Sequence, residues 1–349
     1  MKKVIMAIAI FFVTVANAAN VSIIAGIELG SKGVKGVAYE YITSEDGGDE
    51  VSIGKKLYDK KINTTIMSGV QDNTVLTQNI DETSNAIKKI YDELRNIDPQ
   101  FIVVVGSTAF DKIKNKDEIA NAVKQKIGVE LKFITADEEM YYGLQACVPQ
   151  KKLKNAILID IGSGNTKIGY ATPFSSNGFE SMTVPYGTVT MKEKAQQNND
   201  FLAGLKSVVE TDIKPMLKKA IQKQPGLANI NRNIYIVGGT PWAVSNFMHT
   251  EQIEHKYITL DLDDIQNFRK KLIKNQSYYE PNYGKANSGK AKKEISKIMD
   301  VFSSEDLIAG STILEEVLSE LKAGKRKIKF PREGGWLLGY MFNTYYQTK

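Results

Sequence analysis

Short apolar runs alternate with amphipathic stretches along most of the chain. In the first half, runs such as 21–29 and 101–105 have the length and apolar character of buried strands. Between them, residues 81–95 place apolar side chains three and four positions apart, the spacing of a helix with one buried face. The expected strands of this half are 21–29, 34–41, 53–57, 101–105 and 131–134, and the expected helices are 81–95, 117–127 and 137–146. This alternation predicts a layered α/β lobe.

The second half restarts the pattern. An apolar strand, a glycine-rich turn and a further strand follow one another again within residues 156–171. Residues 27–31 align without gaps with residues 159–163, and the same offset of 132 residues places Lys35 over Lys167. Such internal similarity predicts two related half-structures. We place the lobes at 19–150 and 151–349, and expect further helices in the second at 189–223, 241–248, 263–274, 290–302 and 304–321.

The first residues have the pattern of a secretory signal peptide. Lys2 and Lys3 precede an apolar run at 4–13, and Ala16-Asn17-Ala18 supplies the small residues that a signal peptidase requires. The alternatives are an uncleaved membrane anchor or a buried first strand, and the run is short for a membrane span. We therefore expect cleavage after residue 18 and, in a bacterium, a periplasmic or secreted protein. No later stretch approaches about 18 apolar residues, so no stable membrane insertion is expected after cleavage.

Composition excludes several classes of protein. The 42% hydrophobic and 25% charged content is that of a folded soluble chain, and the formal net charge of +6 is only mildly basic. Cys147 is the only cysteine, so no internal disulfide can form. Two histidines, His249 and His255, have no accompanying nucleophile motif. Lysine-rich stretches at 214–223, 285–297 and 322–329 have the spacing of solvated helix faces and no nucleic-acid motif, so DNA is not an expected partner.

Glycine loops at strand ends are the candidate chemistry. Without a Cβ atom, the backbone of such a loop can approach a phosphate closely and direct several N–H groups at it. Loops of this kind follow expected strands at 30–33, 162–165 and 238–240. An acidic residue precedes each of the first two loops, Glu28 and Asp160, and a carboxylate in that position could hold Mg²⁺, or Mn²⁺, beside a phosphate.

Two of these segments resemble the phosphate motifs of the actin-like ATPase superfamily, namely 26–32 and 160–166. More specifically, Val105-Gly106-Ser107-Thr108-Ala109-Phe110 and Ile134-Thr135-Ala136-Asp137-Glu138-Glu139-Met140 are similar to segments of the Ppx/GppA family of exopolyphosphatases and guanosine pentaphosphate phosphohydrolases. Further similar segments lie at 181–189, 236–241, 306–310 and 332–335. The resemblance implies two actin-like (ribonuclease H-like) α/β lobes around a central cleft.

The resemblance also implies a site. Glu139 would be the catalytic carboxylate that orients or deprotonates water, and Glu28 and Asp160 would hold the metal ion, Mg²⁺ or Mn²⁺. Glu138 is better explained by a favourable charge in the first turn of a helix. The substrate would be polyphosphate or a phosphorylated guanosine nucleotide, and a homodimer is left open. The implied phosphate-binding residues are Gly30, Ser31, Lys32, Ser107, Thr108, Gly162, Ser163, Gly164, Asn165, Thr166, Lys167, Gly238 and Gly239.

Three positions depart from the family pattern. Glu28 stands where the family has Asp, Asp111 where it has Arg, and Lys167 where it has Glu. Lys167 would put an ammonium near the expected metal ion, or pair with phosphate directly, and Asp111 would repel an anionic substrate. The sequence thus predicts an exported phosphohydrolase with a weakened site. The alternatives are a non-catalytic module that binds such polyanions and an actin-like ATPase or sugar kinase, which fits poorly with export.

Overall fold

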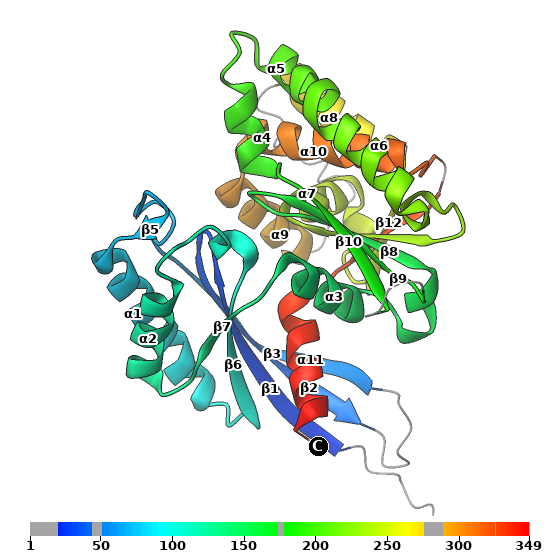
Figure 1. Ribbon diagram of the computed structural model, residues 1–349. Helices are drawn as coiled ribbons and strands as arrows, with labels where there is room; N and C mark the ends of the chain where they lie inside the picture. The colour runs from blue at the N-terminus through cyan, green and yellow to red at the C-terminus, as the bar shows by residue number, and fades with distance from the viewer. Residues whose placement is uncertain (1–19, 44–50, 174–177, 276–288, 325, 349) are drawn as a thin grey trace, which may run out of the picture.

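The computed structural model describes residues 20–43, 51–173, 178–275, 289–324 and 326–348. The predicted signal peptide at 1–18 lies outside these residues. Within the described part of the chain, no helix combines the length and apolar character needed to cross a membrane. Two sheets, each covered by helices on both faces, form two lobes (Figure 1). The predicted α/β class is therefore confirmed.

The first sheet has the order β3-β2-β1-β6-β7. Its strands are β1 (Asn20–Gly30), β2 (Gly33–Thr43), β3 (Val51–Asn63), β6 (Phe101–Gly106) and β7 (Leu131–Phe133). A separate two-stranded ribbon is formed by β4 (Val70–Gln71) and β5 (Thr74–Val75). Helices α1 (Thr77–Arg95) and α2 (Lys116–Ile127) pack on one face and bury an apolar cluster there. Gly128, with φ of 74°, ends α2 as its C-cap.

The second sheet has the order β10-β9-β8-β11-β13-β12. Its strands are β8 (Ala156–Ile161), β9 (Thr166–Ala171), β10 (Phe179–Val184), β11 (Asn233–Gly238), β12 (Tyr257–Leu260) and β13 (Ile328–Pro331). One face carries α3 (Ala136–Cys147). The other carries α4 (Thr188–Ala195), α5 (Phe201–Val208), α6 (Lys214–Lys223), α7 (Gly239–Met248), α8 (Leu262–Asn275), α9 (Gly289–Val301) and α10 (Ser304–Glu320).

The repeat seen in the sequence is a repeat of topology. Strand β1 pairs antiparallel with β2 and parallel with β6, and β8 pairs in the same way with β9 and β11. In both sheets the central strand therefore has a hairpin partner on one side and a parallel partner on the other. The two lobes have related topologies, as the 132-residue offset predicts.

Three expectations differ from the structure. The helix expected at 137–146 in the first lobe is α3, which packs on the second sheet. The single helix expected at 189–223 is divided into α4, α5 and α6, with a π-helical turn at Val209–Ile213. Pro215 follows this turn and cannot donate a hydrogen bond to it, which disfavours a regular α-helix there. The C-terminal helix α11 (Trp336–Gln347), which the sequence placed with the second lobe, packs instead on β1 and β2 of the first.

Helices α3 and α11 join the two lobes by packing against each other (Figure 1). Their backbones approach so closely that a Cβ atom on Gly339 would lie 1.9 Å from the carbonyl oxygen of Tyr142. Only glycine fits at this crossing. Because α3 lies on the second sheet and α11 on the first, this contact sets the position of one sheet relative to the other.

Candidate active site

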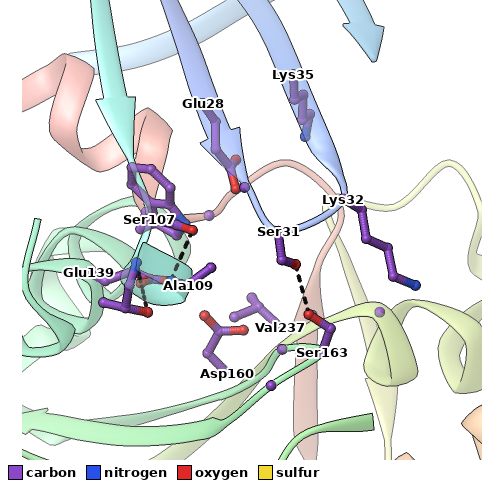
Figure 2. Close-up of a pocket in the computed structure, with 18 of the residues that line it drawn as sticks. Glu28, Ser31, Lys32, Lys35, Ser107, Ala109, Glu139, Asp160, Ser163 and Val237 are labelled. Carbon is purple, nitrogen blue, oxygen red and sulfur yellow. Dashed lines mark hydrogen bonds between the residues drawn. The ribbon is translucent and has the colours of Figure 1, made fainter. Parts of the chain in front are cut away.

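A cavity of about 650 Å³ lies between the two lobes. Its walls are the turns that follow β1, β6, β8 and β11, together with the segment between β13 and α11. Gly30 and Gly162 both line it, so the two glycine loops of the repeat meet at one cleft, as predicted. Figure 2 shows Ser31 and Ser163 at this meeting point, with their hydroxyl oxygens 3.1 Å apart.

Strand alternation directs both acidic strand-end residues into the cavity. On β1, Ala25, Ile27 and Leu29 face α1 and α2, so Glu28 lies on the opposite face of the sheet. On β8 the isoleucines at 157, 159 and 161 face the large helical layer, so Asp160 lies on the face that carries α3. In Figure 2, Glu28 and Asp160 extend from opposite sides of the cavity.

A third glycine turn closes the cavity between β11 and α7. Gly238 has φ of +107°, a conformation that L-residues with side chains rarely adopt. A Cβ atom at this position would also lie 2.1 Å from the carbonyl oxygen of Ile161. Gly238 therefore allows the turn after β11 to pack directly against the end of β8, beside the second glycine loop.

Glu139 enters the cleft from the first turn of α3. The preceding Thr135 accepts a hydrogen bond from the backbone N–H of Glu138 at 3.2 Å, and the Glu138 carboxylate accepts one from the backbone N–H of Thr135 at 2.9 Å. This capping box commits Glu138 to the start of the helix, in line with its predicted structural role. Glu139, one position later, lines the cavity, and only 6% of its surface is exposed.

Both carboxylate oxygens of Glu139 accept hydrogen bonds. Thr108 donates its hydroxyl to Oε2 at 2.6 Å and its backbone N–H to the same oxygen at 3.3 Å. Lys167 donates from Nζ to Oε1 at 2.9 Å, and only 3% of its surface is exposed. The turn after β6, helix α3 and strand β9 therefore meet at this one carboxylate.

Lys167 also faces Asp160, its partner in the β8–β9 register. Burial lowers the pKa of the Lys167 ammonium, but the charges of Glu139 and Asp160 and the hydrogen bond to Glu139 raise it more, so its pKa lies above the ordinary value. Lys167 is thus a buried, charged side chain. For Asp160, burial and the charge of Glu139 raise the pKa more than Lys167 lowers it.

Glu28 occupies in the first lobe the position that Asp160 occupies in the second. It pairs in register with Lys35 across the β1–β2 hairpin, as Asp160 does with Lys167. Burial raises the pKa of Glu28, the charge of Lys35 lowers it, and the charges of Glu139 and Asp160 raise it. The carboxylates of Glu28, Glu139 and Asp160 therefore repel one another around the same cavity.

The residues present do not fit a divalent cation. Within the described ranges, no group of three or more Asp, Glu, His or Cys side chains is close enough to hold a metal ion. Glu28 and Asp160, predicted to bind metal, both line the cavity, but the cation in contact with Glu139 is the Lys167 ammonium. Mg²⁺ takes oxygen ligands in near-octahedral geometry, and an ammonium cannot be one of them.

Most of the other predicted residues also line the cavity. Those that do are Gly30, Ser31, Lys32, Ser107, Thr108, Gly162, Ser163, Gly164, Asn165, Lys167, Gly238 and Gly239. Thr166 does not, because its fully buried hydroxyl donates to the carbonyl oxygen of Tyr186 at 2.8 Å. Asp111 is exposed beyond the turn that holds Thr108 and is absent from the lining. Thr166 is thus a structural residue, and Asp111 is not part of the cavity wall.

Sequence reasoning missed two basic groups. Lys61 lines the cavity from β3, where it pairs in register with Lys35. No local motif marks Lys61, and only the pairing of β2 with β3 brings it to the cleft. Arg332 lines the cavity after β13, and its segment, 332–335, was noted only as similar to the family. Trp242 and Trp336 add aromatic surface from α7 and α11.

Solved structures with the same two-lobed arrangement identify the class of the fold. The Ppx/GppA family member from Aquifex aeolicus is 17% identical with a TM-score of 0.68, over 95% of this chain and 99% of that chain. An exopolyphosphatase from Cytophaga hutchinsonii is 15% identical with a TM-score of 0.66, over 94% of this chain and 99% of that chain. The fold is thus the actin-like fold of these proteins.

The sequence profile of the Ppx/GppA phosphatase family matches residues 48–329, and the chain belongs to this family. A comparison with curated proteins gives no match. The matched range includes Glu139, Asp160 and Lys167, whereas the first glycine loop precedes it.

Proposed function

We propose that this protein is a slow phosphohydrolase that removes terminal phosphate from polyphosphate or guanosine pentaphosphate in the cleft between its lobes. The observation that carries the proposal is the position of Glu139, a buried carboxylate where the turns from both lobes converge. The membership of this chain in the Ppx/GppA phosphatase family supports phosphatase chemistry. The structural likeness to an exopolyphosphatase supports the fold that positions these residues.

A cluster of lysines supports a substrate with several phosphate groups. Lys32, Lys35 and Lys61 line the same wall of the cavity, and none of them forms an ion pair with a described carboxylate. Burial, followed by the charge of Lys32, lowers the pKa of Lys61, the direction expected where ammonium groups lie close together. A bound polyanion would relieve this repulsion, so the cluster favours phosphate chains over a neutral ligand.

The reaction needs positioning more than covalent chemistry. Water attacks the terminal phosphorus, the bridging P–O bond breaks, and orthophosphate leaves a chain that is shorter by one unit. Glu139 would orient this water and accept its proton, while glycine loops and lysines hold the phosphates. Thr108 donates twice to Oε2 and Lys167 once to Oε1, so the water would have to share Oε1 with the Lys167 ammonium. This competition is our reason for proposing slow turnover.

Non-catalytic binding of the same polyanions is the second candidate. The same contacts favour it, because three donated hydrogen bonds and 6% exposure leave the Glu139 carboxylate little room for water. In that case the lysine cluster would bind the phosphate chain and Glu139 would only position Lys167. An actin-like ATPase or sugar kinase would share the glycine loops of the cavity and fits poorly with export.

Release and binding should be measured on the same preparation. Orthophosphate release from polyphosphate, guanosine pentaphosphate and ATP is followed with and without Mg²⁺, and polyphosphate binding is followed by calorimetry. We expect binding together with slow release from at least one of the first two substrates. Binding with no release selects the second candidate, and release from ATP alone rejects both.

We further propose export, which rests on the residue pattern at 1–18 alone. The mature chain would then begin at Ala19 in the periplasm or outside the cell. Mass spectrometry of the N-terminus of the native protein tests this, and retention of Met1 in the cytoplasm would reject it.

A further inference from the structure

Lys167 is held in place by the sheet as well as by its ion pair. It lies within β9, between Thr166 and Ile168, both fully buried, and its strand pairs with β8 on one side and β10 on the other. A long side chain that starts from such a fixed backbone and ends on Glu139 has little freedom to leave the cavity. Its ammonium is therefore held within the cavity.

Lys35 shows that the hairpin alone does not bury such a lysine. It occupies the equivalent position in the repeat and faces Glu28 in the same antiparallel register. Yet the Lys35 side chain is exposed and has no ion pair with a described residue, whereas Lys167 is buried against a carboxylate. The difference comes from α3, which brings Glu139 to Lys167.

The charges around the cavity indicate a role for the Lys167 ammonium. Three carboxylates, Glu28, Glu139 and Asp160, line the cavity, and an anionic phosphate beside them needs a nearby cation. A divalent ion bound between Glu139 and Asp160 would lie next to the Lys167 ammonium, which repels it and supplies no oxygen ligand. The ammonium already contacts one of these carboxylates and faces the other.

We propose that Lys167 is the resident cation of this site: its ammonium stands in place of a divalent metal ion and neutralises bound phosphate. The inference rests on the proposed function only for the identity of the anion. Exclusion of the metal ion follows from the position of the Lys167 ammonium, which contacts Glu139 and faces Asp160, whatever reaction occurs there.

Titration of the full-length protein with Mn²⁺ alone tests the exclusion. Lys167→Glu would add a carboxylate beside Glu139 and Asp160, so we expect it to bind Mn²⁺ about 100-fold more tightly than the wild type. Lys55→Glu is the control, since it makes the same charge change at an exposed residue outside the cavity lining, and its Mn²⁺ affinity should stay near that of the wild type. Equal Mn²⁺ affinity of the wild type and a folded Lys167→Glu variant would overturn the proposal.

Pyrophosphate binding in EDTA tests whether the Lys167 ammonium neutralises bound phosphate. This test remains possible if Lys167→Glu does not fold. The wild type should bind inorganic pyrophosphate without metal, and Lys167→Met, which keeps the length of the side chain, should bind it at least about 10-fold more weakly. Loss of wild-type binding in EDTA, or unchanged binding by Lys167→Met, would overturn the role of the ammonium. Neither result depends on hydrolysis, so a protein that releases no phosphate still tests this inference.

Discussion

The hydroxyl groups of Ser31 and Ser163 lie 3.1 Å apart, and these serines occupy the same position in the two halves of the repeat. Ser31 follows Gly30, the last residue of β1, and Ser163 follows Gly162, the first residue after β8. The cleft is therefore closed at this point by a contact between equivalent loops. A ligand bound here contacts both lobes at once, which is the arrangement expected of a site built on a duplicated fold.

Reversing the charge of Lys61 should weaken polyphosphate binding. Lys61→Glu puts a carboxylate among the lysines that line the cavity, so we expect the affinity to fall by at least about 10-fold and to depend less on salt. Lys55→Glu is the control, because Lys55 is an exposed residue of the same strand outside the cavity lining. Calorimetry at two salt concentrations measures the polyphosphate affinity of each variant and its dependence on salt. An equal loss of affinity in the two variants would assign the effect to net charge alone.

A side chain at Gly238 should destabilise the protein. Gly238→Ala forces a Cβ atom against the carbonyl oxygen of Ile161 in a conformation with φ of +107°, so we expect a loss of at least about 2 kcal/mol in the free energy of unfolding. Gly164→Ala, at a position with open space around the new atom, should change it by less than about 0.5 kcal/mol. Urea unfolding measures the free energy of unfolding of both variants. Similar losses in Gly238→Ala and Gly164→Ala would contradict the close approach of Gly238 to the carbonyl oxygen of Ile161.

His249 should make stability depend on pH. Its ring nitrogens form hydrogen bonds with Asp264 at 3.0 Å and with Glu251 at 2.9 Å. These two carboxylates, with Asp264 making the larger contribution, raise the pKa of His249 from 6.5 to about 9. Because the folded-state pKa is the higher one, the stabilisation is complete below about pH 6.5 and is lost as the pH rises through about 9. The total loss is at most about 3 kcal/mol.

Urea unfolding across this pH range checks the His249 prediction. The fall in stability should be much smaller in His249→Gln, and it should persist in His255→Gln, a control at an exposed residue. A wild type whose unfolding free energy is the same at both ends of this range would show that the His249 ion pairs contribute nothing.

The sequence predicted the parts of this molecule whose causes are local. Strand periodicity and the 132-residue offset predicted two related lobes, because each half repeats its own pattern of apolar and glycine residues. The same repeat correctly predicted that Gly30 and Gly162 line one cleft. Glu139 was found by its resemblance to a family segment, and its burial agrees with a place in the site.

What the sequence did not predict depends on packing between distant segments. Lys61 reaches the cavity only through the register of β2 with β3. Helix α11 joins the first lobe because its apolar face covers β1 and β2. The sequence of residues 336–347 does not indicate which sheet this face covers. Lys167 was noted as a reversed charge, but its ion pair with Glu139 requires α3 and β9 to be placed side by side.

The rate of orthophosphate release from polyphosphate by Glu139→Gln tests the central claim most directly. The substitution keeps the shape of the side chain and removes the group that would accept a proton from water. We expect the wild type to release phosphate at well below about 10 per second, and the variant to be at least about 100-fold slower. Polyphosphate binding should be retained, which shows that the cleft is intact. A variant as fast as the wild type would contradict the assignment of Glu139 and with it this account of the site.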